Sequence, residues 1–231
     1  MTRDLLIDVI IPAYNEEGSI SMVLCDIPRT LVREVIVCNN ASTDQTAEVA
    51  KLYGATVLDQ PRKGYGSACL KGISYIHEKR QPPDIVVFMD ADYSDYPEEM
   101  PKLLEPILKR NADLVIGSRA LGNREKGSMM PQQIFGNWLA TNLIRLLYGY
   151  HFTDLGPFRA IRFSKLLQLD MKDSDFGWTV EMQIKAAKNH LKCEEVPVSY
   201  RKRVGISKVS GTIRGTILAG YKILWTIFKL W

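Results

Sequence analysis

The sequence predicts an α/β fold in which helices flank a mainly parallel β-sheet. Short apolar runs rich in β-branched residues alternate with amphipathic segments along the first half of the chain, the order of strands and helices found in such folds. The runs are apolar throughout rather than at every second position, which is typical of parallel strands buried on both faces. Hydrophobic residues make up 46% of the 231 residues, enough to bury a sizeable core and to argue against disorder.

The first half of the chain alternates expected strands with expected helices. The strands are Asp8–Pro12, Glu34–Cys38, Ala55–Leu58, Ile85–Met89 and Asp113–Gly117. The helices are Ser19–Ile27, Thr43–Tyr53, Ser67–Glu78 and Glu98–Arg110. Because ligands of doubly wound sheets sit beyond the carboxyl ends of the strands, we expect this half to build a nucleotide site.

The order of elements changes after Gly117. The expected elements are a polar loop at Ser118–Met130, a helix at Gln133–Tyr148, a loop that contains Thr153–Arg159, a helix at Trp178–Asn189, a strand at Glu194–Tyr200 and a last helix at Thr212–Trp231. No internal repeat or low-complexity linker divides the chain. We therefore expect the second half to elaborate the same domain rather than to fold independently.

Charge is distributed unevenly along the chain. The formal net charge is +4, but residues 196–231 contain seven lysines and arginines and no acidic residue, which leaves −3 for the residues before them. A basic tail that ends in aromatic residues suits phosphates or an anionic membrane surface, and a solvated basic face is equally compatible with it. The acidic body and the lack of a recognition motif argue against a nucleic-acid partner.

Cysteine usage and the first residues both indicate a cytoplasmic protein. Cys25, Cys38, Cys69 and Cys193 stand in apolar surroundings without a C-x-x-C pair, so we expect reduced core residues rather than disulfides. Residues 1–4 lead into a strand-like segment without a basic-then-apolar leader. No uncharged apolar run reaches the ~20 residues of a membrane span.

Two carboxylates follow the buried run Ile85–Met89. Asp90 and Asp92 are two residues apart, so in an extended chain both side chains face the same side and can reach one hard cation. Mg²⁺ or Mn²⁺ held there would neutralise a departing diphosphate. The alternative is an acidic turn that caps the helix beginning near Glu98, but a position at the end of the fourth strand favours the metal site.

Other strand ends carry groups that suit a nucleotide. Pro12–Gly18 combines polar side chains and a glycine where a helix begins, which suits a ribose and base; N-capping by Asn15 is the alternative. Asn39 offers an amide that can both donate to and accept from a base edge. Arg62 and Lys63 place cations at the entry of another helix, a position that suits phosphate oxygens.

Five segments, in their order and spacing, resemble family 2 glycosyltransferases of the GT-A fold. They are V-I-I-P-A-Y-N-E-E, V-I-V-C-N-N-A-S-T-D, G-Y-G-S-A, F-M-D-A-D and V-I-G-S-R. The match covers residues 8–119, and the chain looks most like the dolichyl-phosphate and polyprenyl-phosphate mannosyl- or glucosyltransferases. The resemblance implies one GT-A domain over residues 1–231, with a nucleotide-sugar-binding half at 1–119, an acceptor-side half at 120–210 and a C-terminal amphipathic helix at 211–231.

The resemblance also implies an activity and a donor site. It implies inverting transfer of a hexose from a donor of the GDP-mannose or UDP-glucose type to a polyprenyl or dolichyl phosphate, with Mg²⁺ or Mn²⁺ at Asp90 and Asp92. The residues implied around the nucleoside are Pro12, Tyr14, Glu16 and Asn39, and those implied near the donor phosphates are Lys63, Arg119, Arg203 and Lys208. The last two lie in Tyr200–Lys208, which resembles the family's basic lid loop. The family often has Asp-Asp where this chain has Asn39-Asn40, which leaves the donor base open.

The second half supplies the expected acceptor side. Arg159 lies where such relatives have an acceptor loop, and its guanidinium could hold an acceptor phosphate. Glu181, in the first turn of an expected helix, either faces the acceptor or favours the helix dipole. A lipid phosphate is already anionic and needs no general base, whereas a hydroxyl acceptor would need Asp154 or Glu181 as its base. The expected catalytic residues are Asp92, Asp154, Arg159 and Glu181.

Two rival functions stand beside this one. The first is a soluble family 2 glycosyltransferase that acts on a hydroxyl acceptor, which the lack of membrane association would favour. The second is a non-catalytic nucleotide-sugar-binding protein, against which the retained Asp90 and Asp92 argue.

The last expected helix, Thr212–Trp231, is apolar over most of its circumference. Arg214, Lys222 and Lys229 fall within one narrow arc, and aromatic residues stand near the chain end. This pattern is typical of a helix that lies in a membrane interface, which would place the protein at the cytoplasmic face of a membrane. The alternatives are docking on its own sheet or on a second subunit, the latter giving a homodimer.

Overall fold

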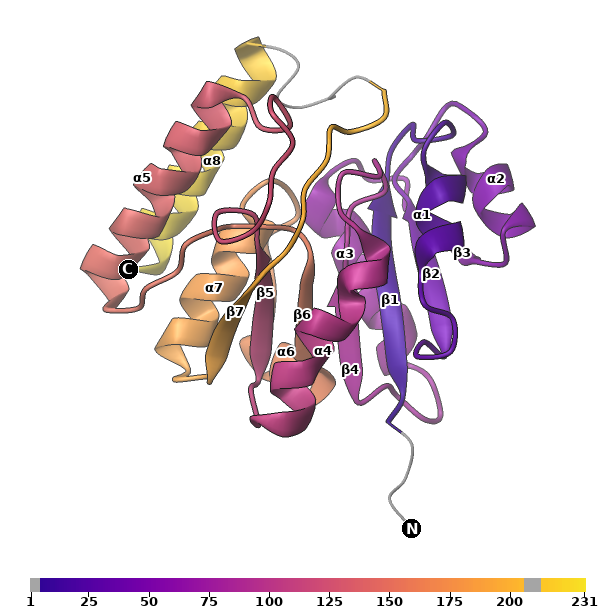
Figure 1. The fold of residues 1–231 in the computed structure, drawn as a ribbon, viewed down its shortest axis with the longest axis horizontal. Helices are drawn as coiled ribbons and strands as arrows, with labels where there is room; N and C mark the ends of the chain where they lie inside the picture. The colour runs from indigo at the N-terminus through magenta and orange to yellow at the C-terminus, as the bar shows by residue number, and fades with distance from the viewer. Residues whose placement is uncertain (1–4, 206–212) are drawn as a thin grey trace.

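Seven strands form one sheet that carries helices on both faces (Figure 1). The fold is that of a computed structural model, which describes residues 5–205 and 213–231. The strand order is β3-β2-β1-β4-β6-β5-β7, and β6 alone runs antiparallel to its neighbours. The strands are β1 (Ile7–Ala13), β2 (Glu34–Asn39), β3 (Thr56–Asp59), β4 (Ile85–Phe88), β5 (Leu114–Ser118), β6 (Arg159–Arg162) and β7 (Cys193–Pro197). The predicted α/β fold with a mainly parallel sheet is confirmed.

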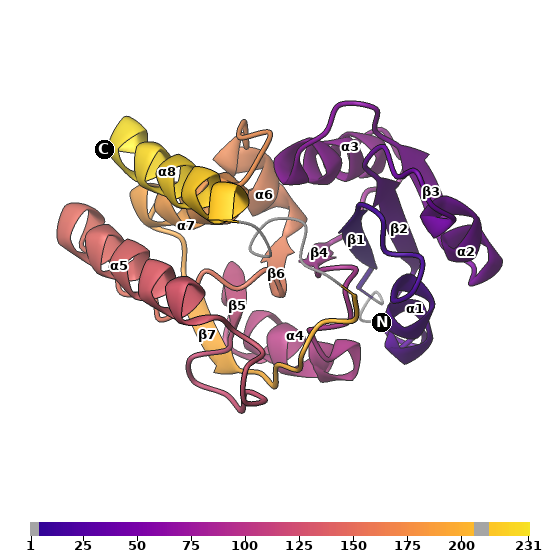
Figure 2. The ribbon, with the colours of Figure 1, turned by 90° about the horizontal axis from the view of Figure 1, so that it is seen from above.

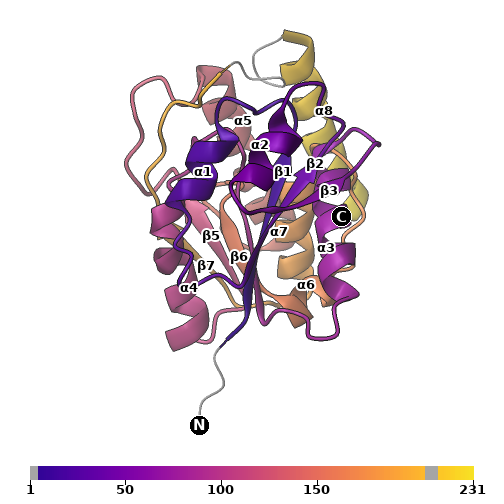
Figure 3. The same ribbon diagram turned by 90° about the vertical axis from the view of Figure 1, so that its right-hand side faces the viewer.

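Helices cover the sheet in two layers (Figure 3). One face carries α1 (Ile20–Asp26), α2 (Thr46–Leu52) and α4 (Met100–Lys109), the last preceded by the 3₁₀ turn η1 (Pro97–Glu99). The other face carries α3 (Tyr65–His77), α6 (Phe163–Leu169) and α7 (Trp178–Lys188). On the same side, α5 (Pro131–Tyr148) and α8 (Ile213–Leu230) lie next to each other beyond α7 (Figures 1 and 2).

Each central strand divides its side chains between the two layers. In β1, Val9 and Ile11 pack with α1 and α4, whereas Ile10 packs with α3. All residues of β1 are buried. This double burial is the physical reason why the strands read as unbroken apolar runs.

The structure differs from the expected elements around residue 160. Where the sequence predicts the end of a loop, Arg159–Arg162 form β6, a central strand paired with β4 and β5, and α6 follows at once. A four-residue strand that contains two arginines lacks the apolar run by which buried strands are recognised. The exposed Cys25 also differs from the expected core cysteines, whereas Cys38 and Cys69 are buried.

The expected strand Glu194–Tyr200 is shorter than predicted, because β7 ends at Pro197. Beyond it, Tyr200 forms two isolated β-bridges, one with Asp95 and one with Arg124. The segment after β7 therefore runs along the carboxyl edge of the sheet, between the loop after β4 and the loop after β5.

The turns that follow the strands at this edge are tightly folded. Asn15, Ala41 and Tyr93 follow β1, β2 and β4, and they adopt positive φ angles of 54°, 56° and 64°. A left-handed conformation costs a non-glycine residue about 1–2 kcal/mol. Such conformations gather where the chain must hold side chains in place for a function. Figure 2 looks down on this edge.

Helix α8 packs against α7 and α5 of the same chain. Ile227 is fully buried, and the Tyr148 hydroxyl donates a hydrogen bond to its carbonyl. Lys222 forms an ion pair of 2.9 Å with Asp173. Among the described residues of this helix and at its end, the large hydrophobic side chains that are at least half exposed are Ile217, Leu218, Tyr221, Trp225, Phe228 and Trp231. Within the described residues, no helix has the length and apolar character needed to cross a bilayer.

Candidate active site

A cavity of about 440 Å³ opens at the carboxyl edge of β1, β2 and β4. Its lining residues are Pro12, Ala13, Tyr14, Glu16, Asn40, Lys63, Gly64, Tyr65, Asp90, Ala91, Asp92, Asp175, Phe176 and Arg203. Those that the sequence places around a donor are Pro12, Tyr14, Glu16, Lys63, Asp90, Asp92 and Arg203. The volume lies within the range of about 300–1,000 Å³ found for small-molecule sites.

Asp90 and Asp92 line this cavity directly beyond β4. Asp92 Oδ1 accepts a 3.0 Å hydrogen bond from the Ser94 backbone N–H, and Asp92 Oδ2 faces Arg203 at 3.1 Å. Asp90 Oδ1 and Asp95 Oδ1 are buried and have no hydrogen-bond partner in the part of the chain that the structure describes. Buried carboxylate oxygens without partners are costly, so these atoms mark a place suited to an ion or ligand.

The carboxyl groups of Asp90, Asp92 and Asp95 repel one another beyond the carboxyl end of β4. Burial, and then the charge of Asp92, raises the pKa of Asp90 to about 7. Burial and the charges of Asp90 and Asp92 raise the pKa of Asp95 well above its ordinary value. A nearby cation would relieve this repulsion. Asp95 is not among the site residues predicted from the sequence, although it is the third acid of D-A-D-Y-S-D.

The carboxylates fit a metal that the substrate helps to bind. Among residues 5–205 and 213–231, no group of three or more His, Cys, Asp or Glu side chains is arranged to hold an ion by itself. Mg²⁺ is usually bound by one or two carboxylates, with waters and substrate phosphates completing its coordination. Asp90 and Asp92 would therefore suit an ion whose remaining ligands come from outside the protein.

Arg203 spans the cavity between two acidic side chains. Its guanidinium contacts Glu16 Oε1 at 2.7 Å and Asp92 Oδ2 at 3.1 Å. The backbone N–H of Val204 donates to the Asp92 carbonyl at 3.0 Å. Arg203 and Val204, which belong to the expected lid loop, thus both contact Asp92. Lys208, the other expected cation of this loop, lies outside the described residues.

Residues 199–203, the segment that carries Arg203, are held by contacts on both sides of Tyr200. The Arg201 guanidinium lies 3.5 Å from the ring centroid of Tyr93 and 3.9 Å from that of Tyr96, and such cation–π contacts stabilise by about 0.5–1 kcal/mol each when exposed. Glu99 accepts hydrogen bonds from the Ser199 backbone N–H at 2.8 Å and from its hydroxyl at 2.9 Å. Arg203 is therefore positioned by fixed neighbours.

Lys63 lies at the opposite wall of the cavity. Its ammonium donates to the Tyr14 hydroxyl at 2.9 Å and lies 4.7 Å from the centroid of the Tyr14 ring. The next residue, Gly64, has a φ of +138°, and a Cβ there would lie 2.1 Å from the Ser174 carbonyl oxygen. Only glycine lets the start of α3 approach this closely.

Asn40, rather than the predicted Asn39, lines the cavity. The Asn40 amide donates to the Arg62 carbonyl at 2.7 Å and accepts from the Gly64 backbone N–H at 2.8 Å. Asn39 instead donates to Asp59 Oδ1 at 2.9 Å. Because neighbouring residues of a strand point to opposite faces, a difference of one residue moves the side chain away from the cavity.

A further wall of the cavity comes from the loop before α7, which is not predicted from the sequence. Asp175 and Phe176 line the cavity, and the Ser174 carbonyl accepts a 2.9 Å hydrogen bond from the Ser67 backbone N–H. Lys222 of α8 contacts Asp173 in the same loop. No sequence motif predicts that Asp175 and Phe176 line the cavity, because their position depends on packing between elements far apart in the sequence.

Arg119 and Asp154 form a buried ion pair beside the cavity rather than in its lining. Arg119 Nε donates to Asp154 Oδ2 at 2.8 Å, and Arg119 Nη2 donates to Asp154 Oδ1 at 2.7 Å. The Arg119 charge still lowers the pKa of Asp90, against the burial that raises it. Its guanidinium also lies 5.0 Å from the centroid of the Tyr200 ring.

Two of the expected acceptor residues are committed to structural contacts. Arg159 is fully buried and donates to the carbonyls of Leu155 and Gly156, a placement that does not fit contact with an acceptor phosphate. Glu181 is buried, accepts backbone hydrogen bonds from Lys172 and Asp173, and pairs with Lys185. Neither side chain lines the donor cavity.

Comparison with known proteins gives one family. A family model described as Glycosyl transferase family 2 matches residues 8–169. An uncharacterised glycosyltransferase of Mycobacterium tuberculosis is 37% identical over 92% of this chain and 94% of its own length. The undecaprenyl-phosphate mannosyltransferase of Micrococcus luteus is 34% identical over 89% of this chain and 88% of its own length.

Solved structures share the fold. Glucosyl-3-phosphoglycerate synthase from Mycobacterium tuberculosis, in complex with Mn²⁺, UDP-glucose and phosphoglyceric acid, superposes with a TM-score of 0.76 at 23% identity, covering 98% of this chain and 79% of that chain. This likeness concerns the fold alone, and it confirms the GT-A fold that the sequence motifs predict.

Proposed function

This chain belongs to glycosyl transferase family 2, and from that premise we propose that it moves a hexose from a nucleoside-diphosphate sugar to a polyprenyl phosphate with inversion at the sugar. The observation that carries the proposal is the pair Asp90 and Asp92, with an unpartnered buried oxygen, inside a cavity of about 440 Å³. The named activity of the Micrococcus luteus relative supports the choice of acceptor.

The donor would lie along the walls of this cavity. We place the nucleoside against Pro12, Tyr14 and Asn40, and the diphosphate between Lys63 and Arg203. A bound Mg²⁺ or Mn²⁺ supplies charge neutralisation to the departing diphosphate, and Asp90 and Asp92 would hold it. Arg203 exchanges its contacts with Glu16 and Asp92 for donor oxygens, so it adds positive charge where the leaving group develops negative charge.

The acceptor side favours a group that needs no general base. Both oxygens of Asp154 receive hydrogen bonds from Arg119, and Glu181 is buried among backbone donors. Neither is free to remove a proton from a hydroxyl group in this arrangement. A phosphate monoester is already anionic near neutral pH and attacks without proton removal. This supports a lipid phosphate over the hydroxyl acceptor.

We place the protein at the cytoplasmic face of a membrane, in peripheral contact through α8. Its exposed Tyr221, Trp225 and Phe228 and the terminal Trp231 are amphipathic or apolar anchors, and interfacial helices bury such side chains at the level of the lipid headgroups. Flotation of the intact protein with anionic vesicles tests this placement. Recovery of all protein in the vesicle-free fraction would contradict it and favour the soluble alternative.

A transfer assay tests the reaction. Purified protein is incubated with GDP-mannose or UDP-glucose, Mn²⁺ or Mg²⁺, and a prenyl phosphate in vesicles, and glycolipid formation is measured. We expect transfer from one donor and a loss of at least about 100-fold in Asp92→Asn. Asp170→Asn is the matched control, because Asp170 is exposed and has the positive φ that asparagine tolerates.

Three outcomes would overturn the proposal. Equal rates in Asp92→Asn and wild type would reject the carboxylate site. Transfer to a prenyl alcohol but not to the prenyl phosphate would reject the acceptor and support the hydroxyl alternative. Donor binding without transfer to either acceptor would support a non-catalytic binding protein.

A further inference from the structure

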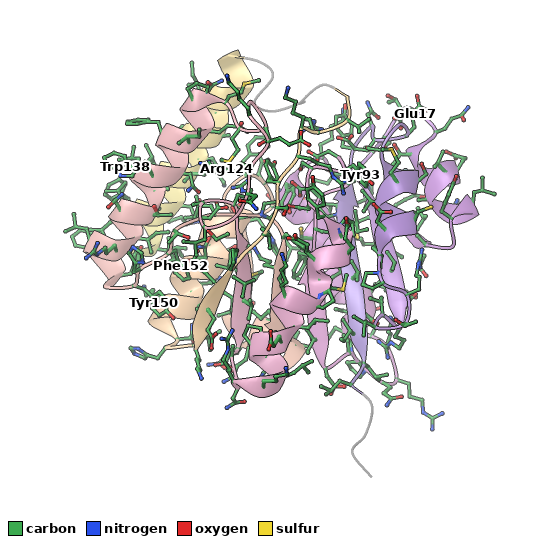
Figure 4. The ribbon with its side chains drawn as sticks, in the orientation of Figure 1. Glu17, Tyr93, Arg124, Trp138, Tyr150 and Phe152 are labelled. Carbon is green, nitrogen blue, oxygen red and sulfur yellow. The ribbon has the colours of Figure 1, made fainter. Side chains whose placement is uncertain are left out.

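A second cavity, of about 370 Å³, lies beside α5. Its lining residues are Ala120, Arg124, Met129, Ile134, Asn137, Trp138, Thr141, Asn142, Arg145, His151, Phe152, Thr153 and Asp154. Figure 4 shows Arg124, Trp138 and Phe152 on the side of the molecule that carries α5, whereas Glu17, near the donor cavity, lies on the other side. This cavity shares no lining residue with the donor cavity.

The ionisable groups of this second cavity favour an anion. Arg124, Arg145 and His151 line it, and Asp154 is its one carboxylate. Arg119 neutralises Asp154 through a bidentate contact of 2.7 and 2.8 Å. Within the described residues neither Arg124 nor Arg145 forms an ion pair with an acidic side chain, so two guanidinium groups are available to a ligand. Guanidinium groups match phosphate oxygens in geometry and charge.

The rim of this cavity is apolar. Ile134 and Trp138 line it and are 44% and 58% exposed, and the neighbouring Phe135 is 61% exposed. These side chains share one side of α5, which packs beside α8 with its own exposed aromatic residues. A ligand with a charged head and an apolar chain matches this combination of cations and exposed apolar side chains.

The positive charge of the helices beside this cavity also favours an anionic ligand. Helices α5 and α8 contain Arg145, Arg214, Lys222 and Lys229 and no acidic residue. Two copies of this chain docked through such surfaces would repel each other. An anionic lipid surface would be attracted.

The second cavity lies a short distance from the donor carboxylates. Tyr200 forms β-bridges with Asp95 and with Arg124, and paired strands lie about 4.8 Å apart. The Arg124 backbone is therefore about 10 Å from that of Asp95, across the Tyr200 segment. Asp95 in turn contacts the backbone N–H of Asp90. The loop that carries Arg124 thus lies beside the loop that carries Asp90 and Asp95.

From this arrangement we propose that the second cavity is the subsite for the acceptor phosphate, with Arg124 and Arg145 as its phosphate-binding cations and the α5 rim as the entry for the lipid chain. The inference rests on the proposed function. In the transfer, an acceptor phosphate oxygen forms a bond to the anomeric carbon, the bond from that carbon to the donor diphosphate breaks, and the diphosphate leaves with the electron pair. No proton is exchanged.

Substitution of the two arginines tests the subsite. The Michaelis constant for a prenyl phosphate in phosphatidylcholine vesicles is measured for wild type, Arg124→Met, Arg145→Met and the double variant. We expect each single change to raise it at least about tenfold, because each removes a charged hydrogen bond to phosphate. The Michaelis constant for the donor stays unchanged. Lys126→Met is the control, since Lys126 is exposed but does not line the cavity.

The outcomes separate this inference from the proposed function. Transfer that is unaffected by both arginine substitutions would overturn the subsite and leave the function standing. If wild type transfers nothing, co-sedimentation with vesicles decides: binding that needs prenyl phosphate and is lost in the double variant supports the subsite, and binding that is equal in both proteins rejects it.

Two further arms identify the source of the phosphate and protect against misfolding. Inorganic phosphate that competes as effectively as the prenyl phosphate would reject the lipid chain as part of the ligand. Arg124→Lys and Arg145→Lys keep the charge, so partial recovery of lipid binding relative to the methionine variants supports a contact with phosphate. No recovery, in variants that melt like wild type, would contradict it.

Discussion

The two cavities of this protein hold their charged side chains in opposite ways. In the donor cavity, Arg203 is shared between Glu16 and Asp92, while Asp90 and Asp95 are crowded together with unpartnered buried oxygens. In the second cavity, Arg124 and Arg145 are exposed. The first arrangement is preorganised for a cation and a diphosphate. The second is suited to attracting an anion from a surface.

The difference follows from where each cavity stands in the fold. The donor cavity uses turns that follow buried parallel strands, where each side chain is fixed by neighbours on both sides. The second cavity uses one face of α5 and the loops beside it, with the outer surface of the helix left exposed. This contrast is what we expect if bonds break in the donor cavity, where reacting groups must be held precisely, and if the second cavity admits a long apolar chain.

The largest expected effect would come from Asp90→Asn in the donor cavity. Transfer should fall at least about 100-fold, because one of the two charges that we propose to hold the metal is lost. The melting temperature of the metal-free protein should rise, since the change relieves repulsion among buried carboxylates. Activity assays and thermal melts of the same preparation check both. A fall in both quantities would contradict the idea of carboxylates arranged for an absent cation.

Gly64→Ala tests how strictly the donor wall is built. The new Cβ would lie 2.1 Å from the Ser174 carbonyl oxygen at a φ of +138°, so we expect the free energy of unfolding to fall by about 2 kcal/mol or more. Gly18→Ala is the control, because nothing lies within 4 Å of a Cβ there. Urea unfolding gives the unfolding midpoints of both variants. Equal midpoints would show that the backbone at Gly64 and Ser174 can move apart at little cost in stability.

Arg203→Met tests whether the donor cavity and the second cavity bind their ligands independently. We expect donor binding to weaken about tenfold, through the loss of a charged contact with the diphosphate. The Michaelis constant for the lipid phosphate should be unchanged. Lys202→Met is the control, since that side chain is exposed. Calorimetric titration with donor gives the affinity, and an equal loss for donor and lipid would mean that the two sites are not independent.

Glu99→Gln should have the smallest effect. Burial raises the pKa of Glu99, but Lys102 and the hydrogen bonds from Ser199 outweigh it and hold the pKa below its ordinary value. The ionised carboxylate therefore stabilises the folded state above its unfolded pKa, and this contribution is lost as pH falls through the folded value. We expect a loss of about 1 kcal/mol at pH 7. Thermal melts at pH 7 and near pH 3 should show the difference vanish on acidification; a constant difference would contradict this role.

The sequence predicts the donor cavity better than the second cavity. Pro12, Glu16, Asp90 and Asp92 follow apolar runs, and the carboxyl ends of parallel strands meet at one edge. Local pattern and topology therefore place these residues together. Asn39 was expected and Asn40 lines the cavity, because strand-end boundaries uncertain by one residue decide which face a side chain takes.

Other features depend on contacts that no local pattern reports. Phe176 reaches the donor cavity because its loop packs on the start of α3. Arg159 carries a charge that suggests a ligand, yet carbonyls from its own loop accept its hydrogen bonds. Strand β6 is central but too short and too basic to be recognised. The roles of Asp154, Glu181, Arg119 and the other site residues remain predictions.

The most direct test of the account is a crystal of the protein soaked with Mn²⁺ and a nucleoside-diphosphate sugar. Anomalous diffraction measured at the manganese edge locates the ion independently of the protein density. We expect one peak in contact with Asp90 or Asp92 and with the donor diphosphate. A diphosphate bound away from these carboxylates, or a manganese peak elsewhere with none at this corner, would contradict it.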